Sequence, residues 1–164
     1  MMEIAFEPAS AEHVRSLADI FNYYVEHTAA FFILEPLGDE EMRAILFFEN
    51  PRYASFAIRA DKELAGFISL HSHRQRAAYR DTAEVTVCIA PGHTGRGIGL
   101  RAVGFIEEYA QNNGFHVLLA GVTGGNTASE RLFEKKDYVR VAHFKELGYK
   151  MGQWRDVLWY EKIL

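Results

Sequence analysis

The chain has 164 residues, 49% hydrophobic and 24% charged, with a formal net charge of -4 at pH 7. This balance predicts one soluble domain spanning residues 1–164, and the negative charge argues against a broad nucleic-acid-binding surface. A single cysteine excludes an internal disulfide, and no apolar run is long enough to span a membrane, so we expect a cytoplasmic protein without a signal peptide.

Patterns in the first half of the chain predict three strands and two helices. The strands are expected at residues 3–7, 53–60 and 64–70, and the helices from Ser10 to Val25 and from Gly38 to Leu46. Ser10 is predicted to cap the first helix, with His13 at its third position. Residues 28–36 are apolar and aromatic without a clean period, which predicts a loop.

The second half of the chain predicts four more strands and two more helices. The expected elements are a strand at 83–89, a helix from 98 to about 112, a buried strand at 117–122, a helix opened by a capping box at 127–130, and strands at 138–147 and 156–164 joined through residues 148–154. We therefore expect an α/β (α+β) fold, with a mixed, mostly antiparallel sheet of about seven strands flanked by about four helices.

The strand at 83–89 and the turn that follows it organise the chain. Ala83, Val85, Val87 and Ile89 share one face of this strand, and Glu84, Thr86 and Cys88 share the other. The chain then breaks at Pro91-Gly92, turns through glycines 95, 97 and 99, and enters an amphipathic helix. Because the first N–H groups of a helix are unpaired, this turn predicts a site for a phosphate-bearing cofactor.

Glu84 is the candidate catalytic residue beside this turn. An anionic carboxylate within an apolar strand is costly to bury unless it is paired. The position of Glu84 allows two interpretations. Glu84 is either a general base reached through solvent or a glutamate that forms a salt bridge with Arg74, Arg76 or Arg80. Thr86 lies on the same face, where it can hold a water or a substrate group.

Other motifs near this stretch have ordinary explanations. The glycines are not a dinucleotide fingerprint, which would need glycine at Leu100, and the alternative to a phosphate site is a plain strand-to-helix turn. His71 and His73 face the same way without a third ligand, so we expect solvent-exposed histidines and no metal site. Cys88 has no base beside it in the sequence, so it is expected to line the site rather than act as a nucleophile.

The stretch Gly95-Arg96-Gly97-Ile98-Gly99 after an apolar strand resembles the acetyl-CoA pyrophosphate loop of the GNAT superfamily of N-acetyltransferases. The whole chain more narrowly resembles the phosphinothricin and methionine sulfoximine acetyltransferase branch. The matching blocks are residues 20–25 with Thr28 and Phe32, and residues 79–87, 125–129 and 148–157. Four separated blocks in the family's order are specific, whereas the glycine loop alone is not.

The resemblance implies the GNAT fold and acetyl transfer from acetyl-CoA to the α-amine of a small amino acid or analogue, by a homodimer, with Glu84 as a water-assisted base. The residues implied to bind acetyl-CoA are Val87, Cys88, Ile89, Gly95, Arg96, Gly97, Ile98, Gly99, Leu100, Asn126, Ser129 and Phe133. The residues implied to line the substrate site are Phe32, Arg74, Arg76, Tyr79 and Thr86. We expect no nucleic-acid, membrane or metal partner.

Three positions depart from the family pattern. Thr94 stands where the loop usually has Gln or Arg, and Cys88 stands where this branch usually has Tyr. Phe133 stands where the branch often has His and the superfamily a Tyr that can protonate the leaving thiolate, and phenylalanine has no proton to give. The alternative function is therefore a non-catalytic acyl-CoA sensor. Acetylation of a protein or polyamine is a third possibility, disfavoured because arginines suit a carboxylate.

Overall fold

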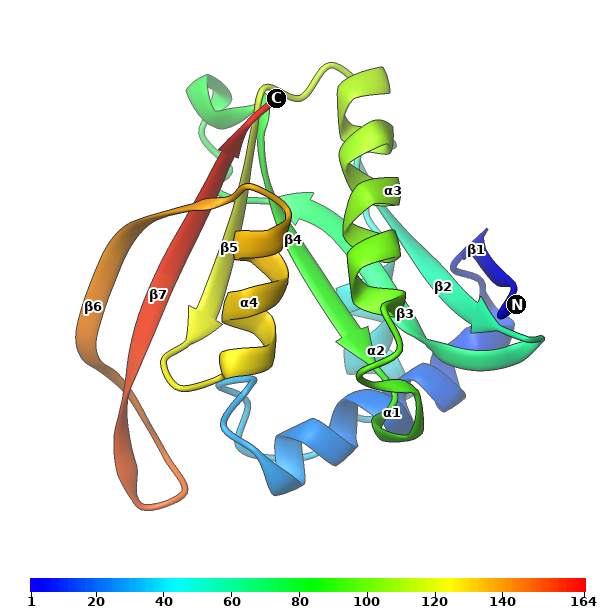
Figure 1. Cartoon of the computed structure of the whole chain (residues 1–164), viewed down its shortest axis with the longest axis horizontal. Helices are drawn as coiled ribbons and strands as arrows, with labels where there is room; N and C mark the ends of the chain where they lie inside the picture. The colour runs from blue at the N-terminus through cyan, green and yellow to red at the C-terminus, as the bar shows by residue number, and fades with distance from the viewer.

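The computed structural model describes residues 1–164 and contains one seven-stranded sheet with helices on both faces (Figure 1). The elements are β1 (Ile4–Pro8), α1 (Val14–His27), α2 (Asp39–Leu46), β2 (Ala54–Ala60), β3 (Glu63–Ser72), β4 (Thr82–Ile89), α3 (Ile98–Asn112), β5 (Val117–Thr123), α4 (Thr127–Lys135), β6 (Val139–Lys150) and β7 (Gln153–Ile163). The predicted mixed fold of about seven strands and four helices is confirmed.

The strands follow the order β1-β2-β3-β4-β5-β7-β6, and every neighbouring pair is antiparallel except β4 and β5. These two pair in parallel over only three positions, from Thr82 with Val117 to Glu84 with Leu119. Beyond Glu84 the two strands part, as Figure 1 shows in the middle of the sheet. The rest of β4 therefore has a backbone edge that no strand covers.

Two apolar cores lie on opposite faces of the sheet. Ala83 and Val85 belong to the core that packs against α3 and α4, and Val87 and Ile89 lie against it. Cys88 belongs to the core that includes α1 and α2. The predicted alternation of β4 is thus confirmed. No helix of the chain combines the length and apolar character needed to cross a membrane.

Several predicted boundaries are wrong in detail. The N-cap of α4 is Asn126, whose side chain accepts from the Ser129 backbone N–H, and Glu130 accepts from the Gly125 N–H, so the cap lies one residue earlier than predicted. β6 and β7 are longer than predicted, and a tight turn at Met151-Gly152 joins them in place of a connection through 148–154.

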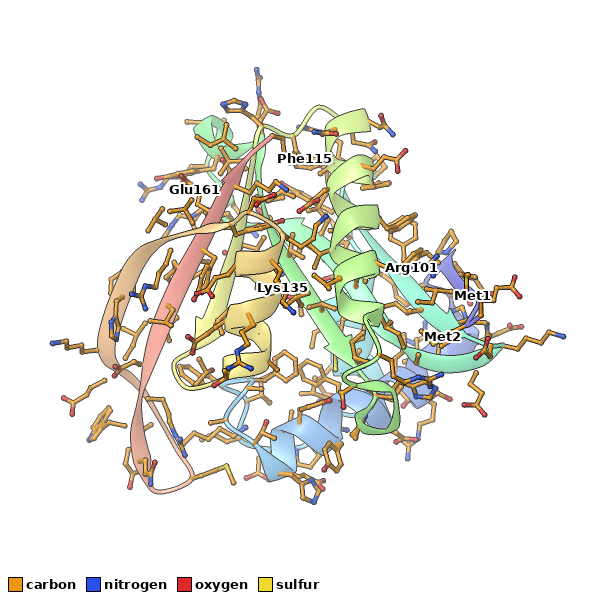
Figure 2. The ribbon with its side chains drawn as sticks, in the orientation of Figure 1. Met1, Met2, Arg101, Phe115, Lys135 and Glu161 are labelled. Carbon is orange, nitrogen blue, oxygen red and sulfur yellow. The ribbon has the colours of Figure 1, made fainter.

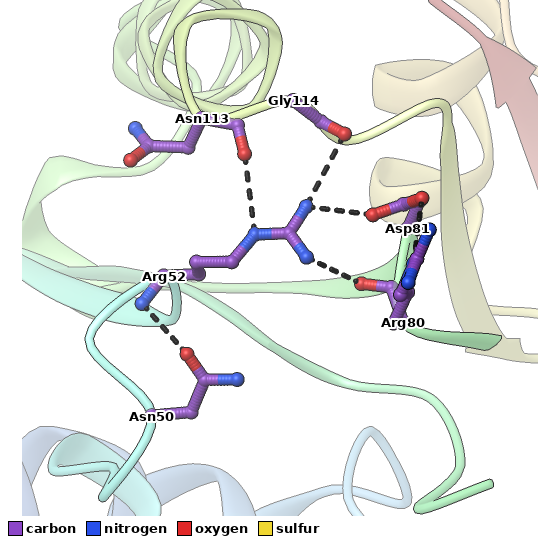
Figure 3. Close-up of polar contacts among 6 residues, drawn as sticks. All are labelled: Asn50, Arg52, Arg80, Asp81, Asn113 and Gly114. Atoms are coloured by element: carbon purple, nitrogen blue, oxygen red, sulfur yellow. Dashed lines mark hydrogen bonds and ion pairs between the residues drawn. The ribbon is translucent and has the colours of Figure 1, made fainter. Parts of the chain in front are cut away.

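Arg52, in the loop before β2, ties the end of α3 to the start of β4 (Figure 3). Its Nε donates to the Asn113 carbonyl at 3.2 Å and its Nη1 to the Arg80 carbonyl at 3.1 Å. Its Nη2 donates to Asp81 Oδ1 at 2.9 Å and to the Gly114 carbonyl at 3.2 Å. The planar, forked guanidinium reaches all four acceptors at once. It therefore fixes the end of β4 from which Glu84 projects.

Arg52→Ala is expected to lower the melting temperature by roughly 4–8 °C, since several acceptors lose their donor. The ring of Phe115, labelled in Figure 2, also loses a guanidinium that lies 4.3 Å from its centroid. Arg52→Lys keeps the positive charge but lacks the forked guanidinium, so it should recover less than about half of the lost melting temperature. Thermal unfolding by circular dichroism gives the melting temperature of both variants, and Arg101→Ala, at an exposed arginine, is the control. A wild-type melting temperature in Arg52→Ala would contradict the role of Arg52 in fixing the start of β4.

Candidate functional site

The parting of β4 and β5 opens onto a cavity of about 560 Å³. Its walls are the free part of β4, the glycine turn, the end of β5 and one side of α4. Tyr24 of α1 and Phe31 of the predicted aromatic loop also line it. This volume is typical of sites for small molecules and cofactors.

The glycine turn forms one wall of this cavity. Gly95 and Gly97 have φ values of 73° and 78°, a conformation that glycine adopts without strain. Gly97 is the N-cap of α3, and no side chain caps this end of the helix. A Cβ at either glycine would meet nothing within 4 Å, so backbone conformation rather than crowding requires them. Free N–H groups at the start of a helix such as α3 can bind an anion.

The uncovered edge of β4 forms a second wall. Val87, Cys88 and Ile89 line the cavity there, and none of them pairs with β5. The Tyr24 hydroxyl occupies one backbone group of this edge, because it donates to the Ile89 carbonyl at 2.5 Å. Burial raises the pKa of the Cys88 thiol to about 12, so the thiol stays protonated at neutral pH.

All the residues implied to bind the cofactor line the cavity except Arg96. The Arg96 guanidinium lies instead 3.8 Å from the Asp61 carboxylate. Sequence reasoning missed two further cations on the wall, Arg131 and Lys135, which lie four residues apart on α4. Their spacing on one helix face was the available signal. Figure 2 labels Lys135, in the last turn of α4.

The residues implied to line the substrate site are more scattered. Thr86 lines the cavity, whereas Phe32, Arg74, Arg76 and Tyr79 do not. These four side chains are exposed. Arg74 and Arg76 lie in the loop after β3 and form no ion pair. Of the residues implied to bind substrate, only Thr86 therefore belongs to the cavity wall.

Glu84 lies where β4 and β5 part. Its Oε1 is 2.7 Å from Nδ1 of His73, and the two side chains are 22% and 19% exposed. The expectation of an arginine partner is wrong, because Arg80 pairs with Asp81 and no other arginine reaches Glu84. The carboxylate therefore has an imidazole as its partner.

His71 is the second imidazole beside Glu84. It lies opposite Glu84 in the register of β3 and β4, and its Nε2 is 2.9 Å from Thr86 Oγ1. Burial lowers the pKa of His71, against the opposing effect of the Glu84 charge. The expectation that His71 and His73 are solvent-exposed is wrong, since both are partly buried in this cluster. No three His, Cys, Asp or Glu side chains in residues 1–164 converge as a metal site would require.

Comparisons with known proteins identify the family to which the chain is similar. Residues 17–138 match the family described as acetyltransferase (GNAT). The chain is 32% identical to a phosphinothricin N-acetyltransferase of Streptomyces coelicolor, over 99% of this chain and 97% of that protein. It is 27% identical to an L-methionine sulfoximine/L-methionine sulfone acetyltransferase of Salmonella typhimurium, over 87% and 84%. A Salmonella typhimurium structure with acetyl-CoA has a TM-score of 0.87 at 27% identity, covering 99% and 94%.

Proposed function

This chain belongs to the GNAT family of acetyltransferases, and from that premise we propose that it moves acetyl from acetyl-CoA to the α-amine of a small amino acid or analogue. The observation on which the proposal rests is the position of Glu84 where β4 and β5 part; Glu84 does not itself line the cavity, but the next residues, Val85 and Thr86, do. Phosphinothricin, methionine sulfone and methionine sulfoximine are the first candidate substrates, because the names of two relatives specify them.

The cavity suits acetyl-CoA in both shape and charge. The free N–H groups at the start of α3 suit its pyrophosphate, and Arg131 and Lys135 add positive charge nearby. The free edge of β4 from Val87 to Ile89 offers backbone groups to the amides of an extended pantetheine arm. When bound, acetyl-CoA supplies an acetyl thioester that an amine can attack directly.

Glu84 removes the proton that blocks the substrate amine. An α-ammonium with a pKa near ~8–10 is mostly protonated at neutral pH and has no lone pair with which to attack. Glu84 accepts this proton through one or two waters, which leaves a neutral amine. No enzyme nucleophile is needed, in keeping with the protonated, buried Cys88 thiol. Backbone N–H groups of the β4 edge are the donors available to the thioester oxygen.

Phe133 provides no general acid for the departing thiolate. Its side chain is buried in the cavity wall with its ring packed edge-on against Tyr138. Tyr24 is a poor substitute, because its hydroxyl is bonded to the Ile89 carbonyl and burial raises its pKa to about 12. A thiolate with a pKa of about 8.5, by analogy with cysteine, leaves without an acid. We therefore expect transfer without a dedicated side-chain acid.

A homodimer is part of this proposal, and an exposed apolar surface on β6, β7 and their turn supports it. The side chains of this surface are Val139, Val141, Phe144, Leu147, Tyr149, Met151 and Trp154. A concentration of exposed apolar side chains on one pair of strands is typical of protein–protein contacts. We assign the surface to a second copy of this chain.

Thiol release from acetyl-CoA with matched amines tests the proposed substrate class. Phosphinothricin and methionine sulfone are each compared with the amine that lacks the carboxylate on the α-carbon. We expect kcat/KM to be at least about tenfold higher for each amino acid, since a site built for a carboxylate rejects the analogue without it. Equal rates, or a preference for polyamines, would overturn the substrate class. Tight CoA binding with no thiol release for any amine would favour the alternative function, a non-catalytic acyl-CoA sensor.

A further inference from the structure

The Glu84 carboxylate has one oxygen bonded and one oxygen free. Nδ1 of His73 lies 2.7 Å from Oε1, and no protein group bonds to Oε2. A carboxylate only accepts hydrogen bonds, so this contact requires the proton to lie on Nδ1. His71, the other imidazole nearby, bonds to Thr86 instead. The mechanism described above uses neither histidine.

The ring of His73 is itself held by two aromatic rings. Its centroid lies 5.6 Å from that of Tyr79 and 6.0 Å from that of Trp159 on β7, each at an interplanar angle of 78°. Trp159 lies across Gly121 of β5, where a Cβ would come within 3.2 Å of the indole. Trp159 thus contacts Gly121 of β5 on one side and His73 on the other, and His73 bonds to the Glu84 carboxylate. This series of contacts connects β5 and β7 to Glu84 where β4 and β5 part.

We propose that His73 is a positioning residue for acetyl transfer, which holds Oε1 of Glu84 so that Oε2 faces the substrate amine. This inference rests on the proposed role of Glu84 as the base. In that step an N–H bond of the ammonium breaks, the electron pair stays on nitrogen, and the proton passes through water to Oε2. A charge-assisted bond at Oε1 limits rotation of the long glutamate side chain before substrate arrives.

An imidazole is also suited to this task electrostatically. An imidazole N–H donates to one carboxylate oxygen and leaves the other free, so Glu84 can still accept a proton there. An arginine in the same place would stabilise the ionised carboxylate strongly and make it a weaker base. The arginines of the loop after β3 stay away from Glu84, which is consistent with this division of roles.

Two substitutions of His73 separate positioning from simple packing. His73→Asn keeps an N–H donor at the same number of bonds from the backbone as Nδ1, whereas His73→Ala has none. His116→Ala, at an exposed histidine after α3 whose side chain makes no hydrogen bond, is the control. The measurements are kcat and KM by thiol release, acetyl-CoA affinity by calorimetry, and melting temperature. Each is repeated in the Glu84→Gln background.

We expect His73→Ala to lower kcat about tenfold with acetyl-CoA affinity unchanged, and His73→Asn to recover most of the loss. In the Glu84→Gln background, His73→Ala should cause no further loss, because it acts through that carboxylate. Any of three results would overturn this inference. They are a wild-type kcat in His73→Ala, a loss of kcat in His73→Asn as large as in His73→Ala, and a full additional loss of kcat when His73→Ala is added to Glu84→Gln. Wild-type kcat in Glu84→Gln alone would instead refute the base role.

Discussion

Glu84→Gln is expected to lower kcat at least about tenfold at neutral pH while acetyl-CoA binds as tightly as in the wild type. Glutamine has the same shape, and its carbonyl still accepts from His73 Nδ1, but it cannot take up a proton. The glycine turn lies at the other end of β4 and is not altered. Steady-state thiol release gives kcat, and calorimetry gives the dissociation constant of acetyl-CoA.

The defect in Glu84→Gln should shrink as the pH rises. Above its own pKa of about 8–10, the substrate ammonium loses its proton unaided, so the base contributes less. The ratio of wild-type to variant kcat/KM should therefore fall between about pH 7 and about pH 10. Glu108→Gln, on the exposed side of α3, is the matched control and should behave as the wild type at every pH. A ratio that stays constant would contradict proton removal by Glu84.

Gly66→Ala is expected to destabilise the fold strongly and to weaken acetyl-CoA binding. Gly66 lies in β3 with a φ of 142°, and a Cβ there would lie 2.0 Å from the Cys88 carbonyl oxygen and 3.0 Å from Ile89 Cα. Both are backbone atoms of the segment of β4 that lines the cavity, approached from its paired β3 side, so a strand must move. We expect the free energy of unfolding to fall by at least about 3 kcal/mol, which lowers the melting temperature by roughly 6–12 °C.

Gly92→Ala is the matched control for this substitution. A Cβ at Gly92 meets nothing within 4 Å, and its φ lies outside the left-handed region, so its stability should match the wild type. Chemical denaturation measures the free energy of unfolding of both variants, and calorimetry their acetyl-CoA affinity. If Gly66→Ala were as stable as Gly92→Ala, the close approach of β3 to β4 at this position would be wrong.

Local patterns predicted the elements that border a core. The two faces of β4 differ in polarity, so their alternation was visible in the sequence and the structure confirms it. β6 was predicted less well, because most of its residues are exposed and burial imposes no alternation on it. The turn at Met151-Gly152 depends on positive φ at both residues, which the surrounding sequence did not indicate.

The candidate site was predictable only in part, because it depends on how the strands pair. Glu84 and the glycine turn belong to one strand and the turn that follows it, so their relative placement followed from the local sequence. His73 reaches Glu84 through the antiparallel pairing of β3 with β4, and charge alone favoured the neighbouring arginines. The cavity arises because β4 and β5 pair over three positions and then part, which no local pattern encodes.

Identification of the product is the measurement that tests the proposed acetyl transfer most directly. The enzyme is incubated with phosphinothricin or methionine sulfone and with acetyl-CoA labelled in its acetyl carbonyl, and the product is examined by nuclear magnetic resonance. We predict that the label bonds to the α-nitrogen, with thiol released in equal amount, and that Glu84→Gln slows both at least about tenfold. Tight acetyl-CoA binding without transfer of the label to an α-amine would contradict this function.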